Sequence, residues 1–309
     1  MRRGPPRLDR QREGLTIGPF ARGSRKPSLW AAAVLALWPI AADRAAHAAT
    51  ARVVSQNDTV RTSAGSAPID TREVHDIPSR GERTRLLVET AAAPVAVAIL
   101  FAGGKGAVRL TGDGRIGWGN GNFVIRSRVH LLRNGITTAI FDAPTDQPYD
   151  LRLGFRGSAD HATDIGAAIA HLRARYGKPV WLIGTSRGTN SVANAAIRLG
   201  DRGADGIVLT ASVLAWNEKG DNLLDFALEK IVVPVLVAHH EADECWATSP
   251  SDVPELVSRL TAAEQVETRL YGGGVAQGNE CHPFHYHGFH GIEGQVAGDI
   301  AAWIKRLTR

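Results

Sequence analysis

Residues 179–188 of the 309-residue chain read Pro-Val-Trp-Leu-Ile-Gly-Thr-Ser-Arg-Gly, and this segment is the strongest indication of the fold. An apolar run typical of a buried strand ends at Ile183, the pattern Gly-x-Ser-x-Gly follows, and an alanine-rich helical segment comes next. The two glycines suit a tight turn in which side chains would collide with neighbouring strands. Such a turn holds the Ser186 hydroxyl out at the edge of a sheet, above the N-terminus of a helix. Because a glycine-rich chain often contains this pattern by chance, its place between a strand and a helix is what makes it informative.

Short apolar runs alternate with longer amphipathic runs on both sides of this stretch. Apolar and β-branched runs predict strands at 85–88, 95–101, 137–141, 179–183, 206–210, 233–238 and 267–271. Helical patterns lie at 123–133, 159–175, 190–199, 253–263 and 291–307. Several strand runs are almost continuously hydrophobic, as expected of parallel strands covered on both faces. The sequence therefore predicts an α/β protein with a mostly parallel central sheet flanked by helices, whose ligands bind at the carboxyl ends of the strands.

Segments after later strands carry the partners that a serine nucleophile needs. A serine hydroxyl attacks well only when a base takes its proton and a carboxylate orients that base. The strand at 233–238 is followed by His-His-Glu-Ala-Asp-Glu-Cys, in which Asp243 is the expected acid. Residues 281–290, just before the last helix, hold the histidines His282, His285, His287 and His290. Serine, acid and histidine thus follow one another in chain order.

With these motifs in this order, the chain from about Leu86 to its C-terminus resembles the α/β-hydrolase superfamily, and in it the small exported bacterial serine hydrolases without a cap domain. The resemblance implies that Ser186, Asp243 and His287 form a catalytic triad, since family members often carry a His-Gly-Phe step at the catalytic histidine. Only about twenty residues separate the strands predicted at 206–210 and 233–238, so no cap domain fits between them.

The same resemblance implies an oxyanion hole made of two backbone N–H groups. One should come from Arg187, the residue after the nucleophile, and the other from the loop Ala-Gly-Gly-Lys-Gly at 102–106. Gly104 and Lys105 are the two possible donors in this loop, and we choose Gly104. A phosphate-binding loop is a poorer interpretation of these glycines, because the spacing Gly-x-x-x-x-Gly-Lys-Ser/Thr is missing.

The chain contains two cysteines, Cys245 after the expected acid and Cys281 in the histidine-rich segment. In an exported protein an even number of cysteines favours disulfide formation. Given the resemblance, a bridge between Cys245 and Cys281 would tie the acid loop to the histidine loop and hold both partners of the serine in place. Two free buried cysteines are the alternative.

The first 48 residues have the parts of an export signal. A basic region runs to Lys26, an apolar stretch follows at 29–42, and Ala-His-Ala at 46–48 offers a cleavage site. We therefore expect a signal peptide at 1–48, a polar linker or arm at 49–70 and a catalytic domain at 71–309, with the mature protein periplasmic or secreted and without a stable membrane anchor. An uncleaved anchor or a buried helix is the alternative, although the apolar stretch is short for a membrane span and contains Pro39.

The net charge of +5 does not indicate a nucleic-acid partner, because it is concentrated in the leader. Residues 1–48 carry nine basic and three acidic side chains, a net +6, which leaves the rest of the chain near −1. A nearly neutral body offers no electrostatic attraction to a polyanion.

These observations predict a serine hydrolase that acts on an ester or related acyl bond of a small molecule through an acyl-enzyme intermediate, with no cofactor. An acyltransferase with the same triad and a non-catalytic binding protein on the same scaffold are the alternatives. The histidines could instead ligate zinc together with Asp243, but this would leave the Gly-x-Ser-x-Gly turn unexplained, so we expect no metal. Trp118, Trp216 and Trp246 follow strand ends and either line the site or pack in the fold.

Overall fold

The computed structural model describes residues 50–52, 69–151, 154–216 and 222–308. The expected signal peptide at 1–48 lies outside these residues, and so does most of the expected linker at 49–70. No helix in the described ranges is long and apolar enough to cross a membrane.

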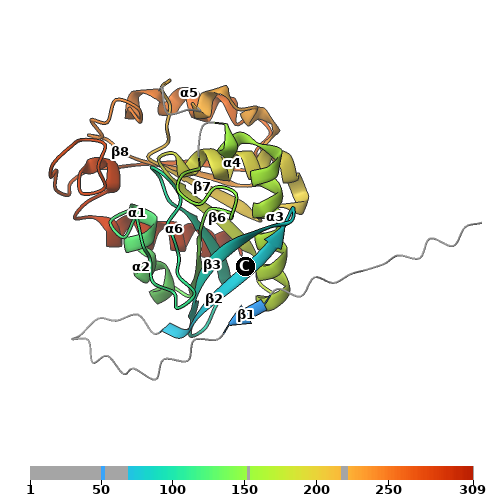
Figure 1. Ribbon diagram of the computed structural model, residues 1–309. Coiled ribbons are helices and arrows are strands. Elements are labelled where there is room, and N and C mark those ends of the chain that lie inside the picture. The colour runs from blue at the N-terminus through green and yellow to red at the C-terminus, as the bar shows by residue number, and fades with distance from the viewer. Residues whose placement is uncertain (1–49, 53–68, 152–153, 217–221, 309) are drawn as a thin grey trace, which may run out of the picture. The chain divides into compact units, whose positions relative to one another are not determined.

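One sheet runs through the described part of the chain, with strands in the order β1-β2-β3-β5-β4-β6-β7-β8-β9 (Figure 1). The strands are β1 Thr50–Arg52, β2 Ile69–Ser79, β3 Glu82–Ala91, β4 Ala96–Phe101, β5 Ile136–Phe141, β6 Val180–Thr185, β7 Gly206–Thr210, β8 Val235–His240 and β9 Val266–Tyr271. All pairs from β5 through β4 to β9 are parallel, whereas β1, β2 and β3 pair antiparallel, as do β3 and β5. The prediction of a mostly parallel sheet is confirmed.

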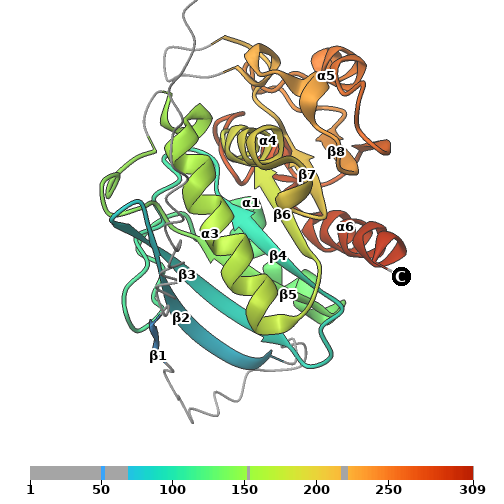
Figure 2. The same ribbon diagram turned by 90° about the vertical axis from the view of Figure 1, so that its right-hand side faces the viewer.

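Helices cover both faces of this sheet (Figure 2). They are α1 Phe123–Arg126, α2 Arg128–Arg133, α3 Ala159–Tyr176, α4 Gly188–Leu199, α5 Val253–Arg259 and α6 Glu293–Leu307, with short 3-10 turns η1 Phe155–Gly157, η2 Gly200–Arg202, η3 Leu223–Asp225, η4 Leu228–Lys230, η5 Pro250–Asp252 and η6 Tyr286–Gly288. Val97 and Ile99 of β4 share a core with α3, α4 and α5, while Ala98 and Leu100 point the other way and share a core with α1, α2 and α6. Because alternate side chains of a strand point to opposite faces, covering both faces requires the continuous apolar runs seen in the sequence.

The helix predicted at 123–133 is interrupted at Ser127 and forms α1 and α2. The buried Ser127 hydroxyl donates a 2.6 Å hydrogen bond to the carbonyl of Phe123, one turn earlier. Hydroxyl groups that bond back to the preceding turn compete with the helical hydrogen bonds and bend helices. The apolar spacing alone therefore predicted a longer helix than the chain forms.

Strand β2 is absent from the sequence prediction because it buries polar residues. Glu73 and His75 are both buried and lie 2.9 Å apart, Oε2 to Nε2. Their other partners come from α3: His171 Nε2 lies 2.8 Å from His75 Nδ1, and the Arg175 guanidinium donates to Glu73 at 2.6 Å. A strand stabilised by such pairs lacks the apolar alternation by which strands are recognised.

Strand β9 forms one edge of the sheet and carries charged side chains. Arg269 donates to Glu267 at 2.7 Å and lies 3.6 Å from Asp299, and Arg306 of α6 also donates to Glu267.

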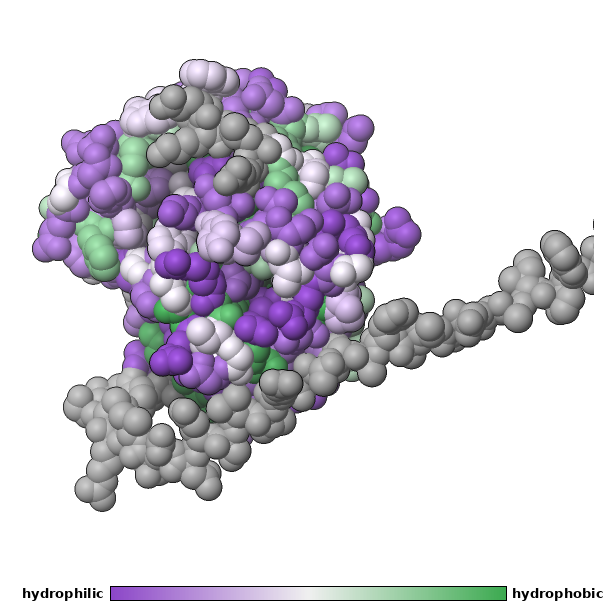
Figure 3. Space-filling model, in the orientation of Figure 1, coloured by the Kyte–Doolittle hydropathy of each residue, from purple (hydrophilic) through white to green (hydrophobic). Residues whose placement is uncertain are grey.

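Figure 3 shows that the visible face of the molecule is largely hydrophilic, with small scattered apolar areas.

The carboxyl ends of the parallel strands meet at one edge of the sheet, where a ligand site is expected. Among the described residues, the connection from β7 to β8 contains only the turns η3 and η4, and no cap domain covers this edge. The expectation of an uncapped fold agrees with this arrangement.

Candidate active site

Ser186 lies in the sharp turn between β6 and α4, and its backbone has a left-handed φ of 52°. The turn is fixed on both sides of the residue. The Ser186 N–H donates to the carbonyl of Thr210 in β7 at 3.0 Å, and Thr189 donates to the Ser186 carbonyl from its N–H at 2.9 Å and its hydroxyl at 2.7 Å. Left-handed backbone is costly for a residue with a side chain, so the surrounding bonds hold Ser186 in a strained conformation.

The glycines on either side of Ser186 are required by contact with backbone atoms. A Cβ atom added to Gly184 would lie 2.6 Å from the carbonyl oxygen of Gly188. One added to Gly188 would lie 2.2 Å from the carbonyl oxygen of Phe101 at the end of β4. Neither backbone neighbour can move aside without displacing a strand or the turn itself, so both positions admit only glycine.

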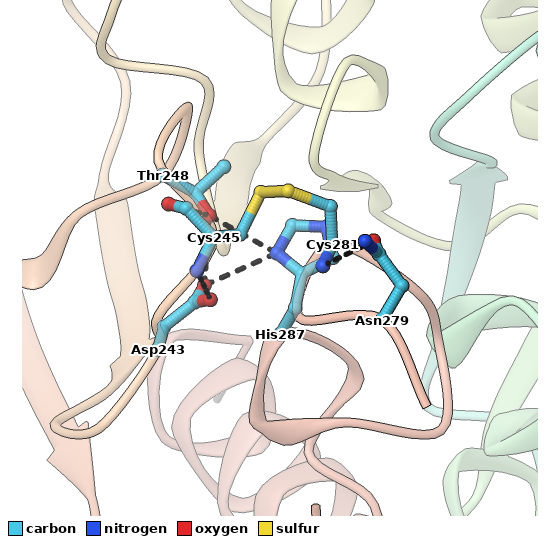
Figure 4. The surroundings of a disulfide bond; sticks show 6 residues. All are labelled: Asp243, Cys245, Thr248, Asn279, Cys281 and His287. Carbon is cyan, nitrogen blue, oxygen red and sulfur yellow. Dashed lines mark hydrogen bonds and ion pairs between the residues drawn. A yellow bond between two sulfur atoms is a disulfide. The ribbon is translucent and has the colours of Figure 1, made fainter. Parts of the chain in front are cut away.

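Asp243 and His287 meet beside this turn, from two separate loops (Figure 4). Asp243 follows β8 and has a fully buried carboxylate, whose Oδ1 accepts the Cys245 N–H at 3.0 Å. Its Oδ2 lies 3.1 Å from Nδ1 of His287, in the turn η6. Since a carboxylate only accepts, Nδ1 carries the proton and the opposite ring nitrogen, Nε2, is left able to accept one.

Thr248 is a third member of this contact that the sequence analysis did not identify. Its buried hydroxyl donates to Asp243 Oδ2 at 2.8 Å. The Thr248 hydroxyl oxygen also lies 3.0 Å from His287 Nδ1 (Figure 4). The imidazole proton is therefore shared between a carboxylate oxygen and a hydroxyl oxygen. Only its position five residues after the acid could have drawn attention to Thr248, and a threonine at that distance is not distinctive.

The disulfide expected between Cys245 and Cys281 is present, with a Cα–Cα distance of 4.6 Å. Cys245 lies two residues after Asp243 and also contributes the N–H that holds the carboxylate. On the other side, the Cys281 N–H donates to Asn279 Oδ1 at 3.0 Å within the loop that leads to His287 (Figure 4). The bridge therefore joins the acid loop covalently to the histidine loop.

Ser186 and His287 line one cleft of about 940 Å³, together with Gly104 and Arg187. In the described part of the chain the Ser186 hydroxyl makes no hydrogen bond, to His287 or to any other group. Bonds between a nucleophile and its base are often long in a free enzyme and shorten when the substrate binds. Trp118 and Trp246 also line this cleft, whereas Trp216 is not one of its described lining residues.

Comparisons with known proteins identify the fold. No family model and no curated protein matches the sequence. Solved structures do match: an esterase of Pyrococcus furiosus has a TM-score of 0.57 at 13% identity, covering 79% of this chain and 92% of that chain. A serine hydrolase without a lid from Xanthomonas campestris has a TM-score of 0.51 at 16% identity, covering 76% of this chain and 94% of that chain. Est1E from Butyrivibrio proteoclasticus has a TM-score of 0.54 at 13% identity, covering 76% of this chain and 98% of that chain.

This chain has the α/β-hydrolase fold. The turn with Ser186, here called the elbow, follows β6, the loop with Asp243 follows β8 and the loop with His287 precedes α6, and no cap domain stands over them in the described ranges.

The loop after β4 lies against Ser186, as a Cβ atom added to Gly103 would be 2.9 Å from Ser186 Cβ. The carbonyl of Gly103 accepts the Gly106 N–H at 3.1 Å. Two guanidinium groups donate to the carbonyl of Gly104, Arg187 at 3.1 Å and the buried Arg156 at 3.3 Å. Because the N–H of a planar trans peptide points away from its carbonyl, these bonds fix the directions of the Gly104 and Lys105 N–H groups, the two candidate donors.

Two further histidines near the acid, His239 and His240, have structural partners. The Nε2 of His239, a fully buried residue, accepts the Ser212 N–H at 2.9 Å, and burial lowers the pKa of His239 to about 4. His240 stacks on Tyr286 with ring centroids 4.5 Å apart. Among the described residues, no group of three or more His, Cys, Asp and Glu side chains is placed to hold a metal ion.

Proposed function

We propose that this protein is a serine hydrolase that cleaves an ester or related acyl bond of a small molecule. The observation that carries the proposal is the buried Asp243–His287 pair, with Oδ2 and Nδ1 3.1 Å apart, whose histidine lines the cleft that also holds the strained Ser186. Two of the structural neighbours are an esterase and a serine hydrolase, which supports the same class of reaction.

Each step uses a group in this cleft. His287 Nε2 takes the proton of Ser186 as the hydroxyl oxygen attacks the carbonyl carbon, and later delivers that proton to the leaving group. Asp243 keeps the imidazole in the required tautomer and stabilises its positive charge. The N–H groups of Arg187 and Gly104 bind the oxyanion, and water then releases the acyl group from Ser186 by the same steps. No step needs a cofactor.

Hydrolysis is favoured over acyl transfer because the cleft is open. In the described ranges no cap domain excludes water from it. Acyl transfer requires an acceptor that competes successfully with water, which an open site does not promote.

Covalent labelling tests the nucleophile. A fluorophosphonate probe should label the wild-type protein and a control variant at an exposed serine, Ser251→Ala, but not Ser186→Ala. Turnover of p-nitrophenyl esters should fall by on the order of 10⁴- to 10⁶-fold in Ser186→Ala, while its circular dichroism spectrum stays that of the wild type. Labelling retained in Ser186→Ala would show that another residue is the nucleophile.

A histidine scan tests the base and separates it from a metal site. Alanine at His287 should cost about as much turnover as alanine at Ser186, whereas alanine at His282, His285 or His290 should cost far less. If dialysis against EDTA removed activity and zinc restored it, the triad assignment would have to be replaced by a metal-dependent mechanism.

We also propose that the mature protein is exported. Disulfides persist mainly in oxidising compartments, so the Cys245–Cys281 bridge supports this location. Expression of the full chain in a bacterial host should yield a mature form in the periplasm or medium with its N-terminus near residue 49. An intact N-terminus in the cytosolic fraction alone would contradict it.

A further inference from the structure

Aromatic side chains from three separate segments line the cleft around Ser186. Trp118 follows β4 in the chain, Trp246 follows the acid, and Phe284 precedes the histidine. Trp246 is 59% exposed and Phe284 is 45% exposed, although large apolar side chains are normally buried. Exposed apolar surface that is gathered at a concave site, and not scattered over the molecule, marks a place where a ligand is bound.

Trp118 and Phe284 are held in place from behind. A Cβ atom added to Gly104 would lie 2.9 Å from the Trp118 ring, so this ring packs on the candidate oxyanion donor. A Cβ atom added to Gly121 would lie 3.0 Å from the Phe284 ring, so that ring packs on Gly121. The Arg126 guanidinium lies 5.3 Å from the centroid of the Phe284 ring. Trp246 directly follows the disulfide-bonded Cys245, which restricts its backbone. Aromatic walls that are fixed before binding lose little conformational freedom when a ring docks against them.

The charges of the cleft balance. Lys105 and Arg187 line it together with Asp150 and Glu280, which gives two positive and two negative groups. Arg187 is further committed to the Gly104 carbonyl at 3.1 Å and lies 3.9 Å from Asp150. The described lining residues therefore provide no net charge to attract an ionic substrate, and the cleft volume of about 940 Å³ accommodates a molecule of two or more rings.

We propose that this hydrolase selects uncharged esters that carry an aromatic ring, which docks against Trp246 and its aromatic neighbours in the cleft. The inference rests on the proposed function, because the ring is placed relative to an acyl group attacked by Ser186. Aromatic rings gain from edge-to-face or offset contact beyond what their apolar area provides. A saturated ring of the same size gains only from area, so a matched pair of esters separates the two contributions.

The experiment compares such pairs by measuring kcat/KM in a pH-stat. Ethyl phenylacetate against ethyl cyclohexylacetate places the ring in the acyl group, and benzyl acetate against cyclohexylmethyl acetate places it in the alcohol. Because a phenyl ring withdraws more electron density than a cyclohexyl ring, each kcat/KM is divided by the rate constant for hydroxide-catalysed hydrolysis of the same ester before the pairs are compared. The aromatic member of at least one pair should be preferred by about 3- to 10-fold. Trp246→Leu should reduce this preference to less than about 2-fold.

Trp216→Leu is the matched control, since Trp216 is 76% exposed but is not a described lining residue of the cleft. This variant should keep both the basal rate and the aromatic preference. Equal rates for both members of both pairs, or a preference that persists in Trp246→Leu, would overturn the inference. If no ester is hydrolysed and fluorophosphonate does not label Ser186, the proposed function itself fails, and that outcome is distinct from hydrolysis without aromatic preference.

Discussion

Replacing Ser186 with glycine should give a more stable protein than replacing it with alanine, although both variants should be inactive. Ser186 has a φ of 52°, and its backbone is fixed there by the bond from its N–H to Thr210 and by two bonds from Thr189 to its carbonyl. Alanine keeps the Cβ atom that makes left-handed backbone unfavourable, whereas glycine lacks it. The comparison therefore measures the strain that the elbow imposes on Ser186.

The magnitude follows from two opposing contributions. Left-handed backbone costs a residue with a Cβ atom roughly 1–2 kcal/mol, which glycine avoids. Glycine in turn gains more backbone freedom on unfolding, which lowers the stability by roughly 0.5–1 kcal/mol. The free energy of unfolding of Ser186→Gly should thus exceed that of Ser186→Ala by about 0.5–1 kcal/mol, or about 2 °C in melting temperature for a domain of this size.

Urea unfolding followed by tryptophan fluorescence gives both free energies, with the disulfide intact. Ser258 provides the control pair, because it is an exposed residue of helix α5. There the order should reverse, with Ser258→Gly less stable than Ser258→Ala by up to about 1 kcal/mol. If Ser186→Ala proved equal to or more stable than Ser186→Gly, the turn would not be strained and the reasoning would be refuted.

Three further changes test other parts of the site. Thr248→Val should lower kcat roughly 10- to 100-fold, while Thr248→Ser should retain most activity; equal loss in both would mean that the hydroxyl plays no part. Reduction of the Cys245–Cys281 bridge, whose cysteines are 36 positions apart, should lower the free energy of unfolding by about 4 kcal/mol in urea titrations, and no change on adding a reductant would contradict this. Burial lowers the pKa of His239 to about 4 from an ordinary value of 6.5, so the unfolded chain binds this proton more tightly. The free energy of unfolding is therefore not reduced by His239 above pH 6.5. Between pH 6.5 and pH 4 it falls by up to about 3 kcal/mol, because the unfolded chain takes up a proton that the folded chain does not. His239→Gln, which keeps an acceptor for the Ser212 N–H, should flatten that dependence, and an unchanged slope would assign it to other groups.

The elbow could be predicted from the sequence because its requirements are local. Gly184 and Gly188 flank Ser186 at fixed spacing, and each is needed because of backbone atoms that the strand–turn–helix arrangement itself brings close. The disulfide could be predicted for a different reason, since a chain with two cysteines allows only one intramolecular pairing.

The contacts that depend on distant parts of the chain could not be predicted. Thr248 lies near the acid in sequence, but its second contact is with His287, 39 positions away. Arg156 reaches the carbonyl of Gly104 across 52 positions. Strand β2 was missed because Glu73 and His75 are buried through pairing with α3, and no periodic pattern records such pairing.

The charged edge strand β9 bears on how the protein behaves at high concentration. A free sheet edge exposes N–H and C=O groups to which a strand of another molecule can add, the first step of many aggregation processes. Glu267 and Arg269 would lose water in such a contact, and each would also have to leave the partners it has in α6. The edge is thus protected by these charged side chains, so replacing both residues with valine should produce aggregates detectable by light scattering under conditions in which the wild type stays dispersed.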